Sequence, residues 1–106
     1  MPYELKVSEK TARQIDEFRQ TFPLGVRTLV LDQIYMELMK LAADPRIASH
    51  ARERSLSLPE HRFMVRGGGE TMEVRVVFRY LQTRDEASLD LLHFGPVEFL
   101  HDDPPA

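Results

Sequence analysis

Alternating hydrophobic and polar residues mark four segments of the chain as strands. In residues 3–8, tyrosine, leucine and valine alternate with charged or polar residues, as in a strand with one buried face. The same alternation occurs three times in the C-terminal half, in residues 61–66, 72–80 and 89–94. Three glycines at 67–69 separate the first two of these segments, and we interpret them as a flexible hairpin connection.

Between these strands, two segments carry hydrophobic residues at helical spacing. Residues 9–21 repeat them every three or four positions, Ser8 is a suitable N-cap, and Pro23 ends the pattern. Residues 26–43 contain neither glycine nor proline and carry a hydrophobic stripe wide enough to predict packing against both the sheet and the first helix. The residues that widen this stripe are Leu31, Tyr35, Met39 and Ala42.

The predicted order of elements is β-α-α-β-β-β, which indicates the α+β class. Short connections between the last three strands favour an antiparallel meander, and the two consecutive helices must then cover one face of that small, antiparallel-dominated sheet. We predict a single domain over residues 1–97 and a flexible acidic tail at 98–106. Residues 46–60 are rich in arginine and serine and form either a loop or one helical turn.

The other face of the predicted sheet carries arginines. Arg62 and Arg66 alternate with hydrophobic residues on one strand, and Arg75 and Arg79 do so on the next. Since side chains on one face of adjacent strands lie close together, we expect these four to converge on an anionic group such as a phosphate. The alternative is a solvent-exposed face on which the arginines pair with acids such as Glu73.

The charge distribution is compatible with an anion-binding surface, although the whole chain has a net charge of −3. Residues 46–84 hold eight Arg and four Glu, which gives a net charge of +4, whereas residues 85–106 hold six acids and neither Lys nor Arg, a net charge of −6. An acidic total therefore hides a basic middle segment.

Several classes of protein are excluded by composition. The chain has no cysteine, which excludes disulfides, thiol catalysis and cysteine-type zinc sites. The histidines form no HxxxH or HExxH pair, so we expect no metal and no cofactor. The apolar runs are too short for a membrane helix and the N-terminus is too charged for a signal peptide, so we expect a cytoplasmic protein that does not bind a membrane.

Two histidines are candidates for acid–base chemistry. His61 and His93 lie at the ends of predicted strands, where they could line the arginine-bearing face. Either would titrate near neutral pH and could serve as a general acid or base. The alternative is that both are ordinary, partly exposed histidines.

The order of elements and several local motifs resemble the RelE/ParE superfamily, the toxins of bacterial toxin–antitoxin modules. The resemblance spans about residues 3–97. It rests on YELKVSEKTARQIDEF for the first strand and helix, LMKLAADPRI for the end of the second helix, and HRFMVRGGG, VRVVFRY and LDLLHFG for the last three strands. The resemblance implies a partner antitoxin that neutralises the toxin. It further implies either cleavage of mRNA on the ribosome, as in RelE-like members, or inhibition of DNA gyrase, as in ParE-like members.

The resemblance also assigns roles to residues. Arg75 matches the central arginine of a family strand motif, and Arg62 matches a basic position on the preceding strand. Two further basic positions of the family are occupied here by Met64 and by Pro96-Val97. The residues that these matches and the strand pattern assign to catalysis are Arg75, Arg62 and His93, and those assigned to phosphate or RNA binding are Arg62, Arg66, Arg75 and Arg79.

Two hypotheses of function follow, and a third, weaker one is an unrelated α+β structural protein whose arginine face is only solvated. The first is a RelE-like toxin that binds ribosome-associated mRNA, with or without cleaving it. The second is a non-catalytic binding protein of the same fold, either a gyrase-directed toxin or a relative that has lost nuclease activity, and the missing basic positions favour it. The oligomeric state is left open by the sequence.

Overall fold

The predicted order of elements is confirmed by a computed structural model, which describes residues 3–48 and 58–97. The acidic tail predicted at 98–106 and residues 49–57 of the arginine- and serine-rich segment lie outside the described residues. The elements are β1 (Glu4–Val7), α1 (Glu9–Arg19), the 3₁₀ turn η1 (Leu24–Val26), α2 (Arg27–Ala43), the 3₁₀ turn η2 (Pro45–Ile47), β2 (Glu60–Gly67), β3 (Glu70–Gln82) and β4 (Ala87–Pro96).

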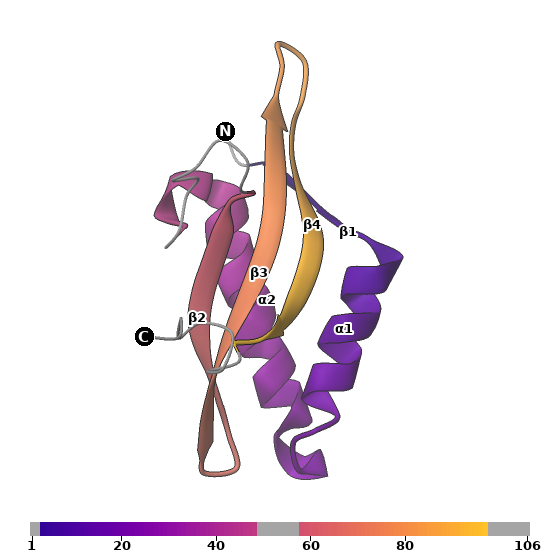
Figure 1. The fold of residues 1–106 in the computed structure, drawn as a ribbon, viewed down its shortest axis with the longest axis vertical. Coiled ribbons are helices and arrows are strands. Elements are labelled where there is room, and N and C mark those ends of the chain that lie inside the picture. Colours follow the sequence, from indigo (N-terminus) through magenta and orange to yellow (C-terminus); the bar gives the residue numbers. More distant parts are fainter. Residues whose placement is uncertain (1–2, 49–57, 98–106) are drawn as a thin grey trace, which may run out of the picture.

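The four strands form one mixed sheet in the order β1-β4-β3-β2. β2, β3 and β4 make the predicted antiparallel meander, and β1 adds to β4 in parallel. In Figure 1, α2 crosses behind the sheet and α1 lies beside β4, so both helices leave the front face of the sheet uncovered by helix. The fold is therefore α+β with both helices packed on one side. Neither helix within the described residues is long and apolar enough to cross a bilayer.

The start of α1 is tied to the sheet by a short chain of hydrogen bonds. The Ser8 hydroxyl accepts from the Thr11 backbone N–H at 3.1 Å, as an N-cap does. The Thr11 hydroxyl, fully buried, donates to the Leu91 carbonyl of β4 at 3.2 Å. The helix cap thereby also fixes where α1 sits on β4.

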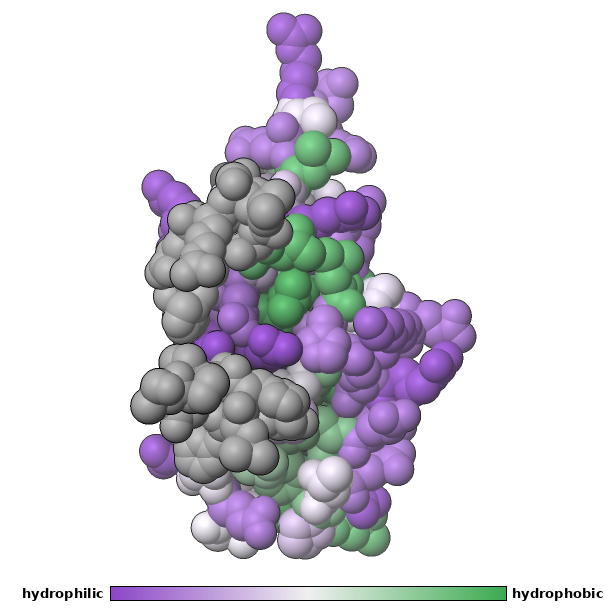
Figure 2. All heavy atoms as spheres, in the orientation of Figure 1, coloured by the Kyte–Doolittle hydropathy of each residue, from purple (hydrophilic) through white to green (hydrophobic). Residues whose placement is uncertain are grey.

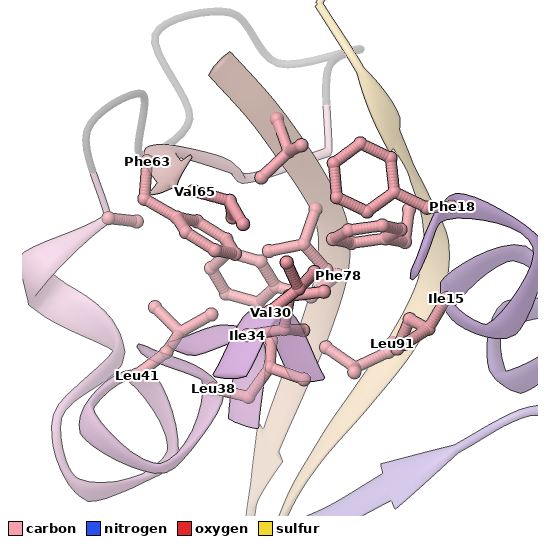
Figure 3. Packing of buried hydrophobic residues seen from close by; sticks show 14 of the residues in the cluster. Ile15, Phe18, Val30, Ile34, Leu38, Leu41, Phe63, Val65, Phe78 and Leu91 are labelled. Atoms are coloured by element: carbon pink, nitrogen blue, oxygen red, sulfur yellow. The ribbon is translucent and has the colours of Figure 1, made fainter. Parts of the chain in front are cut away.

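The hydrophobic core lies between α2 and the sheet. Figure 3 shows Val30, Ile34 and Leu38 of α2 pointing toward Phe78 of β3. All four of these side chains are fully buried, and burial of this size is the main stabilising term for such a domain. The other buried hydrophobic residues are Ile15, Phe18, Phe22, Leu41, Ala42, Ala48, Phe63, Val65, Val74, Val76, Leu89, Leu91 and Phe94.

One part of the predicted helix stripe is wrong. Leu31 and Tyr35 pack against the core and Ala42 is buried, but Met39 is 61% exposed. Met39 follows the buried Leu38 by one residue, which is about 100° around a helix of 3.6 residues per turn. That rotation turns Met39 away from the sheet.

The three glycines form the predicted hairpin connection, which is a tight turn. Gly68 and Gly69 have φ angles of 58° and 84°, and the strands join through these two residues alone. Positive φ at both positions is the geometry of the two-residue hairpin that glycine favours. Gly67 belongs to β2 and is buried against Phe22 and Val30.

The free edge of β2 is closed at one point by a glutamine of α2. Gln33 Nε2 donates to the Arg66 carbonyl at 2.6 Å, and Gln33 Oε1 accepts from the Arg66 N–H at 3.0 Å. This single side-chain amide makes the two hydrogen bonds to Arg66 that a residue of a neighbouring strand would otherwise make. It also fixes the backbone that carries Arg66.

Candidate functional site: an arginine-bearing sheet face

We define the arginine face as the side of β2, β3 and β4 that is turned away from α2. The register pairs Arg62 of β2 directly with Arg75 of β3 and places Arg66 opposite Thr71. Arg79 of β3 lies opposite Asp90 of β4. All four arginines therefore occupy this face, and Figure 2, which views the molecule from this side, shows both hydrophilic and hydrophobic patches.

The expectation that all four arginines converge on one anion is wrong. Arg66 lies four residues beyond Arg62 toward the hairpin, and Arg79 lies four residues beyond Arg75 in the opposite direction. At 3.3 Å per residue, each is about 13 Å from the central pair. The face thus holds a central pair, Arg62 and Arg75, with one further basic residue on each side.

The central pair shares a carboxylate that the strand pattern did not single out. Glu60 Oε1 lies 3.2 Å from Arg75 Nη1 and 3.6 Å from Arg62 Nε. The Glu60 side chain is only 16% exposed. Because β2 begins at Glu60, one residue before the predicted strand, the alternation that places Arg62 on this face also includes Glu60. That signal was present in the sequence and lay just outside the predicted bounds.

Arginine–acid pairing also occurs farther along the face. Arg79 Nε lies 3.4 Å from Asp90 Oδ2, and the Arg79 side chain is 67% exposed. Both partner acids, Glu60 and Asp90, differ from the expected Glu73. The alternative interpretation of a face with structural arginine–acid pairs is thus correct in part. The exposed Arg79–Asp90 pair contributes little stability.

His93 of β4 lies on the same face, two residues before the residue that is opposite Arg75. It is opposite Val77, just before a β-bulge, while the next outward position on β4, Gly95, is opposite Arg75. A Cβ atom on Gly95 would lie 3.4 Å from His93 Nε2. The glycine therefore leaves open the space into which the ring nitrogen of His93 points.

The protonation of His93 is determined by Gln14 of α1. The backbone N–H of Phe94 can only donate, so the Gln14 atom that it meets at 2.9 Å must be the carbonyl oxygen Oε1. The amide nitrogen Nε2 of Gln14 then faces His93 Nδ1 at 3.1 Å and donates to it. His93 is consequently the tautomer with its proton on Nε2, and this N–H points toward the arginine face.

The surroundings of His93 also favour its neutral form. Burial lowers the pKa of His93 from its usual value of 6.5, and the positive charges of Arg75 and Lys10 lower it further. His93 therefore supplies a neutral N–H donor to the face near neutral pH. It does not add a positive charge there.

Gln14→Glu is expected to raise the pKa of His93 by about one unit or more, because a carboxylate can accept from a protonated Nδ1 and favours the charged ring. The second carboxylate oxygen still accepts from the Phe94 N–H. An NMR titration of the histidine ring protons measures this. Gln82→Glu, an exposed glutamine that accepts from the Tyr3 hydroxyl, is the control and should leave His93 unchanged.

The same substitution changes the pH dependence of stability. The pKa of His93 is below 6.5 in the folded protein, so the unfolded chain binds more protons at this residue than the folded chain does. The contribution of His93 to the free energy of unfolding is therefore present above pH 6.5 and is lost as the pH falls. The free energy of unfolding, measured with urea, should fall less between pH 7.5 and pH 5 in Gln14→Glu than in the wild type. An unchanged His93 pKa in this variant would show that Gln14 does not set the tautomer.

His61 does not line the arginine face, and the prediction for it is wrong. Its side chain is 9% exposed and lies on the helix side of β2, where Nε2 is 2.9 Å from Glu37 Oε1 of α2. Its ring stacks on Phe63 with centroids 5.8 Å apart. The cause is the strand alternation itself, since His61 has the same parity as the buried Phe63 and Val65.

A hollow of about 430 Å³ lies between α1 and the ends of β3 and β4. Phe18, Met72 and Phe94 line it, together with the acidic residues Glu17 and Glu70. Two carboxylates disfavour an anion here. The arginine face is therefore the better candidate site for a phosphate.

No three histidine, aspartate or glutamate side chains gather into a metal-binding group in the described part of the chain. Comparisons with protein-family models, with curated proteins and with solved structures each returned no match. A proposal of function therefore rests on the side chains of the face and on the sequence motifs described above.

Proposed function

We propose that the arginine face binds the phosphates of RNA and that the protein is the toxin component of a bacterial toxin–antitoxin system, which binds and cleaves ribosome-associated mRNA. The observation that supports this most is the cross-strand pair of Arg62 and Arg75, with one carboxylate oxygen of Glu60 near both side chains and the N–H of His93 on the same face. Cations, a carboxylate and a neutral donor in one place are the groups that cleavage by a 2′-hydroxyl requires.

The roles follow from the chemistry of each group. Glu60 takes the proton of the 2′-hydroxyl, whose oxygen attacks the adjacent phosphorus. Arg75 and Arg62 stabilise the negative charge that develops on the phosphorane oxygens. His93 donates a hydrogen bond from Nε2 to a phosphate oxygen, and the leaving 5′ oxygen takes a proton from water.

Arg66 and Arg79 have a different role in this proposal. Each lies about 13 Å along its strand from the central pair, so each is better placed for a neighbouring phosphate than for the same one. Both are exposed and are placed to contact neighbouring phosphates of an extended strand, where they position the RNA without taking part in its cleavage.

A second candidate is a binding protein without nuclease activity, such as a gyrase-directed toxin or a degenerate relative. Two observations favour it. Glu60 and Asp90 offset part of the positive charge of the face, and His93 is held in its neutral form. A face of this kind would dock on a partner protein through the same arginines.

Expression of the protein alone in a bacterial host distinguishes the two candidates. The proposal predicts that growth stops, that new mRNA 5′ ends appear within reading frames, and that Arg75→Ala abolishes both. Co-expression with the product of the neighbouring gene, the expected antitoxin, should restore growth. Arrest by the wild type without new 5′ ends would favour the binding protein, and normal growth with folded wild-type protein would contradict a toxin of either kind.

A further inference from the structure

The side of α2 turned away from the sheet is unusually hydrophobic for a surface. Leu29, Met36 and Met39 are 55%, 62% and 61% exposed. A hollow of about 630 Å³ lies on this side of the helix. Its lining residues are Asp32, Tyr35, Met36, Met39, Lys40 and Ala43.

We propose that this surface binds a second copy of the chain, with α2 of one copy antiparallel to α2 of the other about a two-fold axis at Met36. A two-fold interface uses one surface twice, so that surface must be complementary to itself after reversal. On the exposed side, α2 meets this condition at the positions four and seven residues from Met36. At three residues from Met36, Met39 of one copy faces Gln33 of the other.

Across the proposed two-fold axis, opposite charges face each other and a large side chain faces a small one. Asp32 lies four residues before Met36 and Lys40 four residues after it, so each aspartate is level with a lysine of the second copy. Leu29 lies seven residues before Met36 and Ala43 seven residues after it, so a large side chain meets a small one. Met36 meets its own copy, and methionine adapts well to such a contact.

These positions share one side of the helix. Residues three, four and seven apart lie on the same side of an α-helix, whereas Val30, Ile34 and Leu38 are buried on the opposite side. Pairing therefore leaves the core undisturbed. The stretch from Leu29 to Ala43 is about 21 Å long, which is enough for contact over several turns.

Lys40 is available for such a pair. Its Nζ lies 3.8 Å from Glu37 Oε2, and its side chain is 64% exposed. An exposed pair at this distance contributes little, and Glu37 is also held by His61 at 2.9 Å. The lysine can thus turn to Asp32 of a second copy. The charge complementarity favours a second copy over an unrelated partner.

Sedimentation equilibrium of the full chain tests the pairing. The wild type is expected to dimerise reversibly. Met36→Glu places two carboxylates at the axis and should weaken dimerisation at least about tenfold. Met64→Glu, the same change at a methionine on the arginine face that is 53% exposed, should leave it unchanged. A wild type that stays monomeric, or a dimer that Met36→Glu leaves intact, overturns the proposal.

A mixing experiment tests the antiparallel arrangement. Asp32→Lys alone and Lys40→Asp alone each place like charges across the axis and should weaken the dimer. An equal mixture of the two variants restores both opposite-charge pairs, so it should form a heterodimer about as tight as the wild type. Circular dichroism confirms that each variant is folded. Folded variants that fail to associate on mixing overturn the antiparallel pairing.

Discussion

Arg75→Ala is expected to reduce the rate of RNA cleavage about 100- to 1,000-fold, the size of effect seen when one charge-stabilising donor is removed from an active site. Arg75 lies at the centre of the face, directly opposite Arg62 and 3.2 Å from Glu60. Its loss removes a guanidinium from the phosphorane and leaves Glu60 without a principal partner. The measurement is single-turnover cleavage of mRNA on programmed ribosomes.

The controls for Arg75 separate local chemistry from general charge. Arg75→Lys keeps the charge but loses the planar, two-pronged donor, so it should restore only part of the rate. Arg66→Ala removes the same charge from the same face about 13 Å from the pair, and it should lower the rate less than about tenfold. Equal losses for Arg75→Ala and Arg66→Ala would show that the central pair has no special role.

Gly67→Ala is expected to lower the free energy of unfolding by about 1–3 kcal/mol, the usual cost of overpacking a core. A Cβ atom at this position would lie 2.8 Å from Phe22 Cδ2 and 2.8 Å from Val30 Cγ2. Both neighbours are themselves fully buried side chains of the core, so neither can move without disturbing its own contacts. Urea unfolding followed by circular dichroism measures the change.

Gly25→Ala is the matched control for Gly67. Nothing lies within 4 Å of a Cβ atom at Gly25, so this substitution should change the free energy of unfolding by less than about 0.5 kcal/mol. If the two alanine variants are equally stable, the close packing of β2 against α2 at Gly67 is wrong.

Strand alternation and helical spacing were sufficient to predict the order of elements and the antiparallel meander. Each element follows from a local pattern, such as the buried parity of Phe63 and Val65 on β2, and the short connections determine the meander. The parallel addition of β1 to β4 could not be read in this way. It depends on contacts between distant segments, such as the Thr11 hydroxyl on the Leu91 carbonyl.

The arginine face could be predicted only in part. Parity along each strand placed the arginines on one side, but which of them lie opposite one another depends on register. The register pairs Arg62 with Arg75, so Arg66 and Arg79 lie on opposite sides of that pair. Gln14 was missed because its role needs α1 to lie against β4, where one amide meets both His93 and the Phe94 N–H. No pattern local to the helix indicates that contact.

The most direct test of the central claim is an NMR titration of the protein with a short single-stranded RNA that carries 2′-O-methyl groups and therefore binds without being cut. The account predicts that the Nε–Hε signals of Arg62 and Arg75 and the ring signals of His93 shift most, while those of Arg13 on the exposed side of α1 stay in place. Shifts confined to residues outside the arginine face, or no shifts at millimolar RNA, would contradict it.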